Sequence, residues 1–189
     1  MRLDIAFDID GCFVDIMSLL NDRLAKCGIS ILDNGKFEIE CDPPQTVDQL
    51  WNYFVESYAH YEKVPIYPGA RDLCDILFGM SRCPIQFVTG RPSYAATHTH
   101  LLIERFCKVP YTISFTGHHD HSKLDYLNGY KFFVEDRRKT AREIAMTGRT
   151  VYVPNRPWNQ MEYMPGIVRI DGIHDLIENA GDFISGNKS

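Results

Sequence analysis

The chain has 189 residues, an apolar fraction of 44% and a formal net charge of −5 at pH 7. This composition fits a soluble globular protein of one domain, and the acidic balance excludes duplex nucleic acid and an anionic membrane surface as natural partners. No apolar run is long enough for a membrane span, and the six cysteines form no Cys-x-x-Cys pair of a disulfide framework or zinc site, so we expect a protein of the reducing cytoplasm.

The first third of the chain mixes strand and helix patterns. Its predicted elements are a strand at 3–8, a helix at 15–27, a short strand at 36–40 and a helix at 46–62. Gly11 ends the first strand and Gly28 ends the first helix. Residues 29–45 interrupt the helical pattern between them.

From residue 65 onward, strands and helices alternate regularly. The predicted strands lie at 84–89, 111–115, 131–134, 150–153 and 167–170, and the predicted helices at 70–80, 93–107, 139–147 and 173–180. Such alternation predicts an α/β fold with a doubly wound parallel sheet.

One spacing departs from that pattern. The strand ends at Asp8 and Thr89 lie 81 residues apart, whereas a βαβ unit needs only about thirty residues. The surplus predicts a small helical cap, residues 14–64, inserted after the first strand. The core domain would then consist of residues 1–13 and 65–189.

Asp8 and Asp10 stand where the first buried strand runs into a turn. Carboxylates at the carboxyl end of a parallel strand face the crevice in which open α/β sheets bind ligands. One aspartate can act there as a nucleophile, and a second can transfer protons. An isolated pair of this kind is more often a strand end with an Asx-turn, so the rest of the chain has to decide.

Further polar markers follow in chain order, each near a predicted strand end or in the first turn of a helix. They are Thr89, Lys123 and the acidic pair Glu135-Asp136. The order and the residue types resemble the haloacid dehalogenase superfamily of phosphotransferases, and the resemblance spans the whole chain.

The resemblance implies a phosphatase mechanism with an aspartyl-phosphate intermediate. Asp8 would attack phosphorus, and Asp10 would protonate the leaving oxygen and later activate water. Mg²⁺ would be held by Asp8, the backbone carbonyl of Asp10, and Asp136. The phosphate group would be bound by Thr89, Gly90 and Lys123, and Lys123 would also neutralise Asp8 as a point charge. These roles are electrostatically consistent, because a carboxylate can attack a dianionic phosphate only if cations neutralise the charge.

Within the superfamily, the chain is most similar to the 5′(3′)-deoxyribonucleotidases and their small bacterial and phage relatives. The matching pieces are residues 8–11 with Asp15, residues 67–70, residues 122–123 and residues 134–137. The chain departs from that family at three places. Gly90-Arg91-Pro92 replaces the usual Ser-Pro after the threonine, Ile16 stands where the family has an aromatic residue, and Glu135 replaces an aspartate. These departures affect base and sugar preference rather than phosphate transfer.

Aromatic side chains recur at helical spacing in the predicted cap helix. Most such stripes are core, and we assign Phe54 and Tyr58 to the core first. One face of a small cap must nevertheless look at the active site, where a nucleobase needs a flat partner. Trp51 is the best candidate for that contact, with Tyr58, Tyr61 and the loop at Trp158 as alternatives.

A run of histidines precedes Lys123. His118, His119 and His121, with Asp120, raise the alternative of a zinc site. Neighbouring residues of a turn point in different directions, and the segment lacks a helical His-x-x-x-His pair. A solvated loop is the better interpretation.

The sequence therefore predicts a magnesium-dependent phosphatase of small phosphate monoesters, most specifically nucleoside 5′-monophosphates and within these the deoxypyrimidine ones. Three alternatives stay open: a phosphatase of the same fold for a non-nucleotide metabolite, a polynucleotide-end phosphatase, and a silent member that binds a nucleotide without turnover. The acidic charge disfavours the second, and the intact set of acidic, threonine and lysine residues disfavours the third. The oligomeric state is left open.

Overall fold

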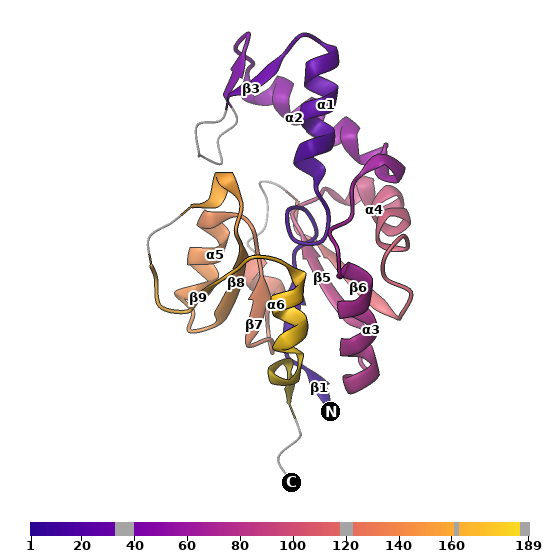
Figure 1. Cartoon of the computed structure of the whole chain (residues 1–189), viewed down its shortest axis with the longest axis vertical. Coiled ribbons are helices and arrows are strands. Elements are labelled where there is room, and N and C mark those ends of the chain that lie inside the picture. The colour runs from indigo at the N-terminus through magenta and orange to yellow at the C-terminus, as the bar shows by residue number, and fades with distance from the viewer. Residues whose placement is uncertain (33–39, 118–122, 161–162, 186–189) are drawn as a thin grey trace.

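The computed structural model describes residues 1–32, 40–117, 123–160 and 163–185. Its centre is a six-stranded parallel sheet in the order β6-β5-β2-β7-β8-β9 (Figure 1). The strands are β2 (Ile5–Phe7), β5 (Ile85–Thr89), β6 (Tyr111–Phe115), β7 (Phe132–Val134), β8 (Thr150–Pro154) and β9 (Ile167–Ile170). The doubly wound parallel sheet expected from the sequence is confirmed. Its winding direction reverses between β2 and β7, the kind of switch point at which open α/β sheets bind ligands.

Helices cover both faces of this sheet. They are α3 (Ala70–Ser81), α4 (Ala96–Ile103), α5 (Arg138–Ala145) and α6 (Ile173–Glu178). Neighbouring residues of a strand point to opposite faces, so Ile5 and Phe7 pack in the core with α3, α4 and α6, whereas Ala6 packs with α5. All three residues of β2 are fully buried, which fixes the strand that leads into Asp8.

The connection between β2 and α3 forms a separate layer beyond the sheet (Figure 1). Its elements are α1 (Ile16–Lys26), β3 (Ser30–Leu32), β4 (Glu40–Asp42), α2 (Val47–Tyr58) and the 3-10 turn η1 (Tyr61–Lys63). A small apolar cluster of its own holds this layer together, formed by Leu20, Leu24, Ile29 and Cys41. An ion pair of 2.6 Å between Arg23 and Glu56 joins α1 to α2. We call residues 14–64 the cap; its boundaries as a domain stay a prediction.

The two chain segments that connect cap and core run side by side. The backbone N–H of Asp15 donates to the carbonyl of Pro65, and the N–H of Tyr67 donates to the carbonyl of Phe13, each at 2.9 Å. Asp15 also begins α1, because its carboxylate accepts the N–H of Ser18 and caps the helix. Entry to and exit from the cap are thus one hydrogen-bonded pair of segments.

Some predicted elements differ in extent. The helix expected at 46–62 ends at Tyr58, and Tyr61 belongs to η1. Arg105, just after α4, donates to the carbonyls of Tyr61 and Val64 and so holds this part of the chain against the end of α4. The helix expected at 93–107 starts as the 3-10 turn η2 (Ser93–Ala95) before α4. The strand expected at 36–40 lies outside the described residues except for Glu40.

The two ends of the described chain also meet. β1 (Arg2–Leu3) and β10 (Ile184–Ser185) pair in an antiparallel manner at the edge of the fold remote from the cap, a pairing that the sequence did not indicate (Figure 1). Within residues 1–32, 40–117, 123–160 and 163–185, no helix has the length and apolar character needed to cross a membrane.

Candidate active site

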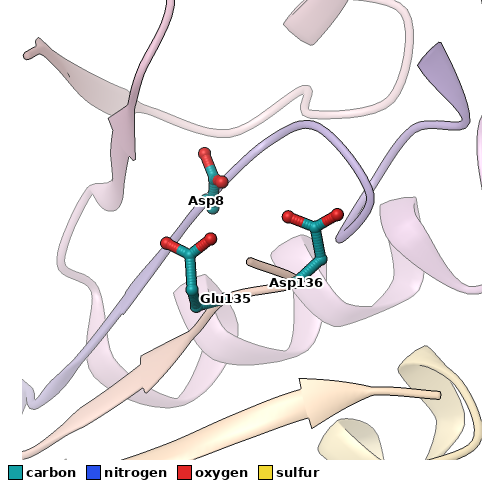
Figure 2. A group of neighbouring side chains, drawn as sticks. All are labelled: Asp8, Glu135 and Asp136. Carbon is teal, nitrogen blue, oxygen red and sulfur yellow. The ribbon is translucent and has the colours of Figure 1, made fainter. Parts of the chain in front are cut away.

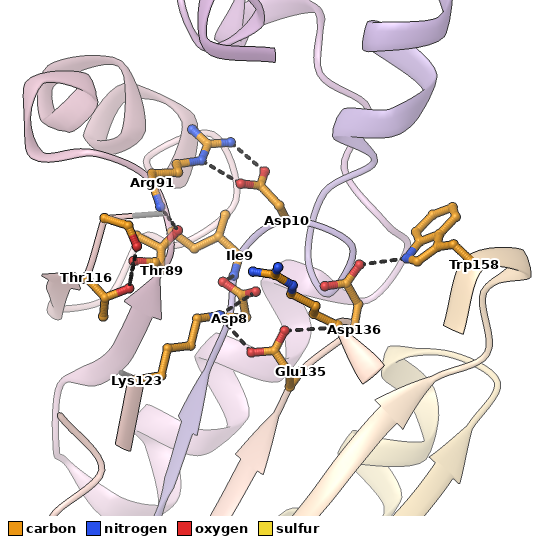
Figure 3. A network of polar contacts seen from close by, with 12 residues as sticks. Asp8, Ile9, Asp10, Thr89, Arg91, Thr116, Lys123, Glu135, Asp136 and Trp158 are labelled. Carbon is orange, nitrogen blue, oxygen red and sulfur yellow. Dashed lines mark hydrogen bonds and ion pairs between the residues drawn. The ribbon is translucent and has the colours of Figure 1, made fainter. Parts of the chain in front are cut away.

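Side chains from three adjacent strand ends meet at the switch point of the sheet. Asp8 follows β2, Thr89 ends β5, and Glu135 and Asp136 follow β7. Lys123 reaches the same place from the 3-10 turn η3 (Lys123–Tyr126) (Figure 3). The structure therefore brings together residues that the sequence spreads over 129 positions, from Asp8 to Asp136, counting both.

Asp8 is held in a single orientation. Its side chain is buried, Oδ1 accepts the backbone N–H of Ile9 at 2.8 Å, and Oδ2 lies 2.7 Å from the Lys123 ammonium. Burial raises the pKa of Asp8 well above its usual value; Lys123 opposes the shift, and the neighbouring carboxylates of Glu135 and Asp136 add to it. A further positive charge beside Asp8 would stabilise its ionised form.

Lys123 lies between two carboxylates. Its ammonium is 2.7 Å from Asp8 Oδ2 and 2.7 Å from Glu135 Oε2. Burial alone would lower the pKa of Lys123, but the two carboxylates outweigh burial and raise it, so the side chain is a permanent cation. Glu135 is fully buried and its other oxygen accepts the backbone N–H of Arg137 at 2.9 Å. Glu135 thus anchors the lysine beside Asp8, a role that the sequence did not reveal.

Asp136 is oriented by the loop after β8. The Trp158 indole N–H donates to Asp136 Oδ2 at 2.9 Å, and the buried Asn159 amide donates to the Asp136 backbone carbonyl at 2.9 Å. Burial and the charge of Glu135 raise the pKa of Asp136 to about 7, although the indole hydrogen bond works against the shift. The sequence offered Trp158 as a substrate contact; the structure shows its indole bound to an acidic residue of the site.

Gly11 leaves room for the Asp136 carboxylate, and a Gly11→Ala change should displace that carboxylate. Its φ is +72°, a region unfavourable for other residues, and a Cβ at this position would collide with the Asp136 carboxylate. Because Asp136 would have to turn away, we expect kcat/KM for a phosphate ester to fall at least about tenfold. Gly28→Ala is the matched control, since Gly28 has a φ of +73° but open space around it. Similar activities of the two variants would contradict this expectation.

The Asp10 side chain points away from the other carboxylates and toward Arg91 (Figure 3). Nε and Nη2 of Arg91 donate to the two oxygens of Asp10 at 2.8 and 2.6 Å. The sequence analysis treated Arg91 only as a departure from Ser-Pro. One feature of the sequence could have indicated this contact: Arg91 lies two residues after the end of a buried strand, at the sheet edge where the acidic residues are expected.

Thr89 ends β5, the strand next to β2, and Gly90 follows it. Thr89 is fully buried; its hydroxyl oxygen accepts the backbone N–H of Arg91 at 3.2 Å, and its carbonyl accepts the N–H of Thr116 at 2.9 Å. Gly90 is partly exposed. Their assignment to phosphate binding stays a prediction, and their position beside Asp8 is compatible with it.

The cap aromatics are placed differently from one another. Trp51 belongs to α2, but its side chain lies outside the described part of the structure. Tyr58 is 3% exposed and its ring lies under the Arg91 guanidinium, 4.3 Å from it. Tyr61 is turned toward α4 and stacks on His98 with 6.1 Å between ring centres. Tyr58 and Tyr61 therefore have protein partners already, and their contact with substrate stays a prediction.

Three buried carboxylates form the candidate metal site. Ligand oxygens of Asp8, Glu135 and Asp136 all lie within 4.8 Å of one another (Figure 2). Asp8 and Glu135 each pair with Lys123 and accept a backbone N–H, whereas Asp136 accepts the Trp158 indole N–H on Oδ2. The three carboxylates offer only oxygen ligands, and Lys123 offsets only part of their negative charge. Such a site fits a hard divalent cation such as Mg²⁺. The alternative histidine cluster at 118–121 lies outside the described residues.

The fold and the position of the site define a class of α/β protein. The six-stranded parallel sheet, with helices on both faces, matches the haloacid-dehalogenase-like fold of solved structures. A candidate β-phosphoglucomutase from Thermotoga maritima has 14% identity and a TM-score of 0.59, over 95% of this chain and 99% of its own.

Two further solved structures have the same fold. A haloacid dehalogenase-like hydrolase from Streptococcus pneumoniae has 16% identity and a TM-score of 0.60, and a haloacid dehalogenase superfamily hydrolase of subfamily IA from Geobacter sulfurreducens has 13% identity and a TM-score of 0.54. Each match covers 93% of this chain and 97% of the other. No protein-family profile and no curated protein sequence matches the chain. At these identities the likeness establishes the fold alone.

Proposed function

We propose that the protein is a magnesium-dependent phosphatase that hydrolyses small phosphate monoesters through a phosphorylated Asp8. The observation that carries this proposal is the buried Asp8 carboxylate, oriented by the Ile9 N–H and paired with Lys123 at the switch point of the sheet. A positioned carboxylate beside a permanent cation is what attack on a dianionic ester requires. The fold of the solved hydrolases is compatible with it.

In the first half of the reaction, the phosphoryl group moves to Asp8. One Asp8 oxygen forms a bond to phosphorus while the bond between phosphorus and the ester oxygen breaks. Asp10, in its protonated form, gives its proton to that leaving oxygen, so the alcohol departs neutral and Asp10 becomes a carboxylate. Lys123 remains protonated and neutralises charge next to the transferred group.

The second half returns the enzyme to its starting state. The Asp10 carboxylate takes a proton from water while the water oxygen bonds to phosphorus, and the bond between phosphorus and Asp8 breaks. Inorganic phosphate leaves and Asp8 is again a carboxylate. A bound Mg²⁺, held by Asp8, Asp136 and the Asp10 carbonyl, would supply positive charge that makes the attacking carboxylate and the phosphate compatible.

We propose nucleoside 5′-monophosphates as the substrate class. The support comes from the motif pieces shared with the deoxyribonucleotidases, residues 8–11, 67–70 and 134–137, and from the aromatic residues of α2. The direct test is a screen of nucleoside monophosphates against sugar phosphates, with and without Mg²⁺. Higher kcat/KM on sugar phosphates would favour a phosphatase of non-nucleotide metabolites. Release of no phosphate from any ester would leave a silent binding protein.

Asp136→Asn should weaken magnesium binding while preserving the fold. The amide keeps one oxygen ligand but loses the negative charge, so the Mg²⁺ concentration for half-maximal activity should rise at least about tenfold, and excess Mg²⁺ should restore part of the rate. A magnesium titration of 4-nitrophenyl phosphate hydrolysis measures this. Asp182→Asn, an exposed change in η5 (Ala180–Phe183), is the control. An unchanged magnesium dependence of Asp136→Asn would exclude the ligand role.

A further inference from the structure

Arg91 is a buried cation at the edge of the site. Its side chain is 1% exposed, and it binds both oxygens of Asp10, whose side chain is 18% exposed. The two hydrogen bonds, 2.8 and 2.6 Å long, form the planar fork by which a guanidinium recognises a carboxylate. A fork of this kind fixes the direction of the Asp10 carboxylate as well as its distance.

Arg91 is itself anchored on the core side. Its Nη1 donates to the hydroxyl of Thr99 in α4 at 3.3 Å, and that hydroxyl donates to the carbonyl of Ala95 at 2.9 Å. Its backbone N–H donates to Thr89 Oγ1. The guanidinium position is thus tied to β5 and α4, two elements that border the site.

The second support of Arg91 comes from the cap. Tyr58 is the last residue of α2, and its ring centre lies 4.3 Å from the guanidinium carbon. Both groups are buried, which is the setting in which a cation–π contact is strongest. Burial also raises the pKa of Tyr58, so the ring is an uncharged partner. One contact therefore links the cap to the residue that orients Asp10.

We propose that Arg91 is a positioning residue that sets the direction of Asp10 for proton transfer, and that Tyr58 makes this positioning depend on the cap. The inference rests on the proposed phosphatase function. Arg91 gives up no proton of its own. When Asp10 carries the proton, one oxygen can still accept from Arg91 while the hydroxyl turns to the leaving oxygen; after donation, the fork is restored.

The test compares two aryl phosphates of similar size. Departure of 4-nitrophenol needs little help from an acid, whereas departure of phenol from phenyl phosphate depends on a well-placed proton. Arg91→Gln should therefore lower kcat/KM for phenyl phosphate at least tenfold more than kcat/KM for 4-nitrophenyl phosphate. Arg71→Gln, an exposed arginine paired with Asp75 in α3, is the control and should leave both values unchanged.

The cap link has its own pair of variants. Tyr58→Phe keeps the ring against the Arg91 guanidinium, whereas Tyr58→Leu removes the ring but keeps an apolar side chain. We expect Tyr58→Phe to match the wild type and Tyr58→Leu to show the same selective loss on phenyl phosphate as Arg91→Gln. If Arg91→Gln fails to fold, this pair decides the matter, because equal behaviour of the two variants would overturn the proposal.

The two proposals fail in different ways. A wild-type protein that hydrolyses neither aryl phosphate would overturn the phosphatase function, and the inference about Arg91 with it. An active wild type with Arg91→Gln reduced by the same factor on both esters would mean that Arg91 only supports the fold. In that case the phosphatase function would stand and the positioning role would not.

Discussion

Asp8→Asn should lower phosphatase activity at least about a thousandfold, a loss of roughly 4 kcal/mol in transition-state stabilisation. The amide has almost the same shape and can still accept the Ile9 N–H, so binding geometry is kept. It cannot, however, form the acyl phosphate bond. Steady-state kinetics with 4-nitrophenyl phosphate measures the loss, and acid quenching followed by intact mass should find one added phosphoryl group on the wild type only.

The same variant should be at least as stable as the wild type in magnesium-free buffer. Because burial raises the pKa of Asp8 in the folded state, the native protein holds that proton more tightly than the unfolded chain does. At neutral pH, above the unfolded pKa, the ionised Asp8 therefore costs stability, and the neutral amide removes this cost. Thermal melts should show an unchanged or higher Tm. Activity within about tenfold of the wild type would refute the assignment of the nucleophile.

The sheet was predictable from the sequence because local patterns and the overall fold agree. The central strands are short runs rich in apolar residues, and each ends at or just before a polar residue, as Thr89 and Glu135 illustrate. The spacing of Asp8 and Thr89 along the chain also indicated that additional elements lie between β2 and α3. Carboxyl ends of parallel strands lie on one edge, so Asp8, Thr89 and Asp136 could be placed together without a structure.

Side-chain pairing was not predictable in the same way. Arg91 is 81 residues from Asp10, and Lys123 is 12 residues from Glu135, with no periodicity to join them. The partners of each cation are set by where the strand ends meet in the fold and by which carboxylates then lie within hydrogen-bond distance. The sequence analysis expected Lys123 to neutralise the phosphate and Asp8. The structure pairs Lys123 with Asp8 and also with Glu135, and the second partner was not expected.

The limits of helical spacing are visible at the end of α2. Tyr58 and Tyr61 are three residues apart, which places them on one face if the helix continues. The helix ends at Tyr58, and the contacts of Arg105 with the carbonyls after it belong to tertiary structure. The two rings consequently have different partners, Arg91 and His98. A local pattern could not distinguish a continuous helix from one that stops a turn early.

Lys123→Met should be the most destabilising single change in the site. Methionine has a similar length but leaves Asp8 and Glu135 buried without their shared cation. Removing one partner of a buried ion pair costs about 3–5 kcal/mol, and we expect a loss in that range from urea unfolding. Activity should also fall, by about 100- to 1000-fold, because charge neutralisation beside the transferred phosphoryl group is lost.

Lys131→Met is the matched control, since its ammonium lies 3.0 Å from Asp4 but the side chain is 69% exposed. Asp4 is buried but keeps its contacts with Arg2 and Ser185 when Lys131 is removed, so the loss of the exposed lysine should cost at most about 1 kcal/mol.

A double variant separates lost pairing from general damage at the site. In Lys123→Met combined with Glu135→Gln, one of the two unpaired charges is gone, so the total loss of stability should be about 0.5–3 kcal/mol smaller than the sum of the two single losses. Activity should not return with it, because Asp8 still lacks the cation at 2.7 Å. Strictly additive stabilities would show that Lys123 and Glu135 do not act as a pair. Recovery of activity together with stability would instead make Lys123 a support of the fold rather than a neutralising charge for the transferred phosphate.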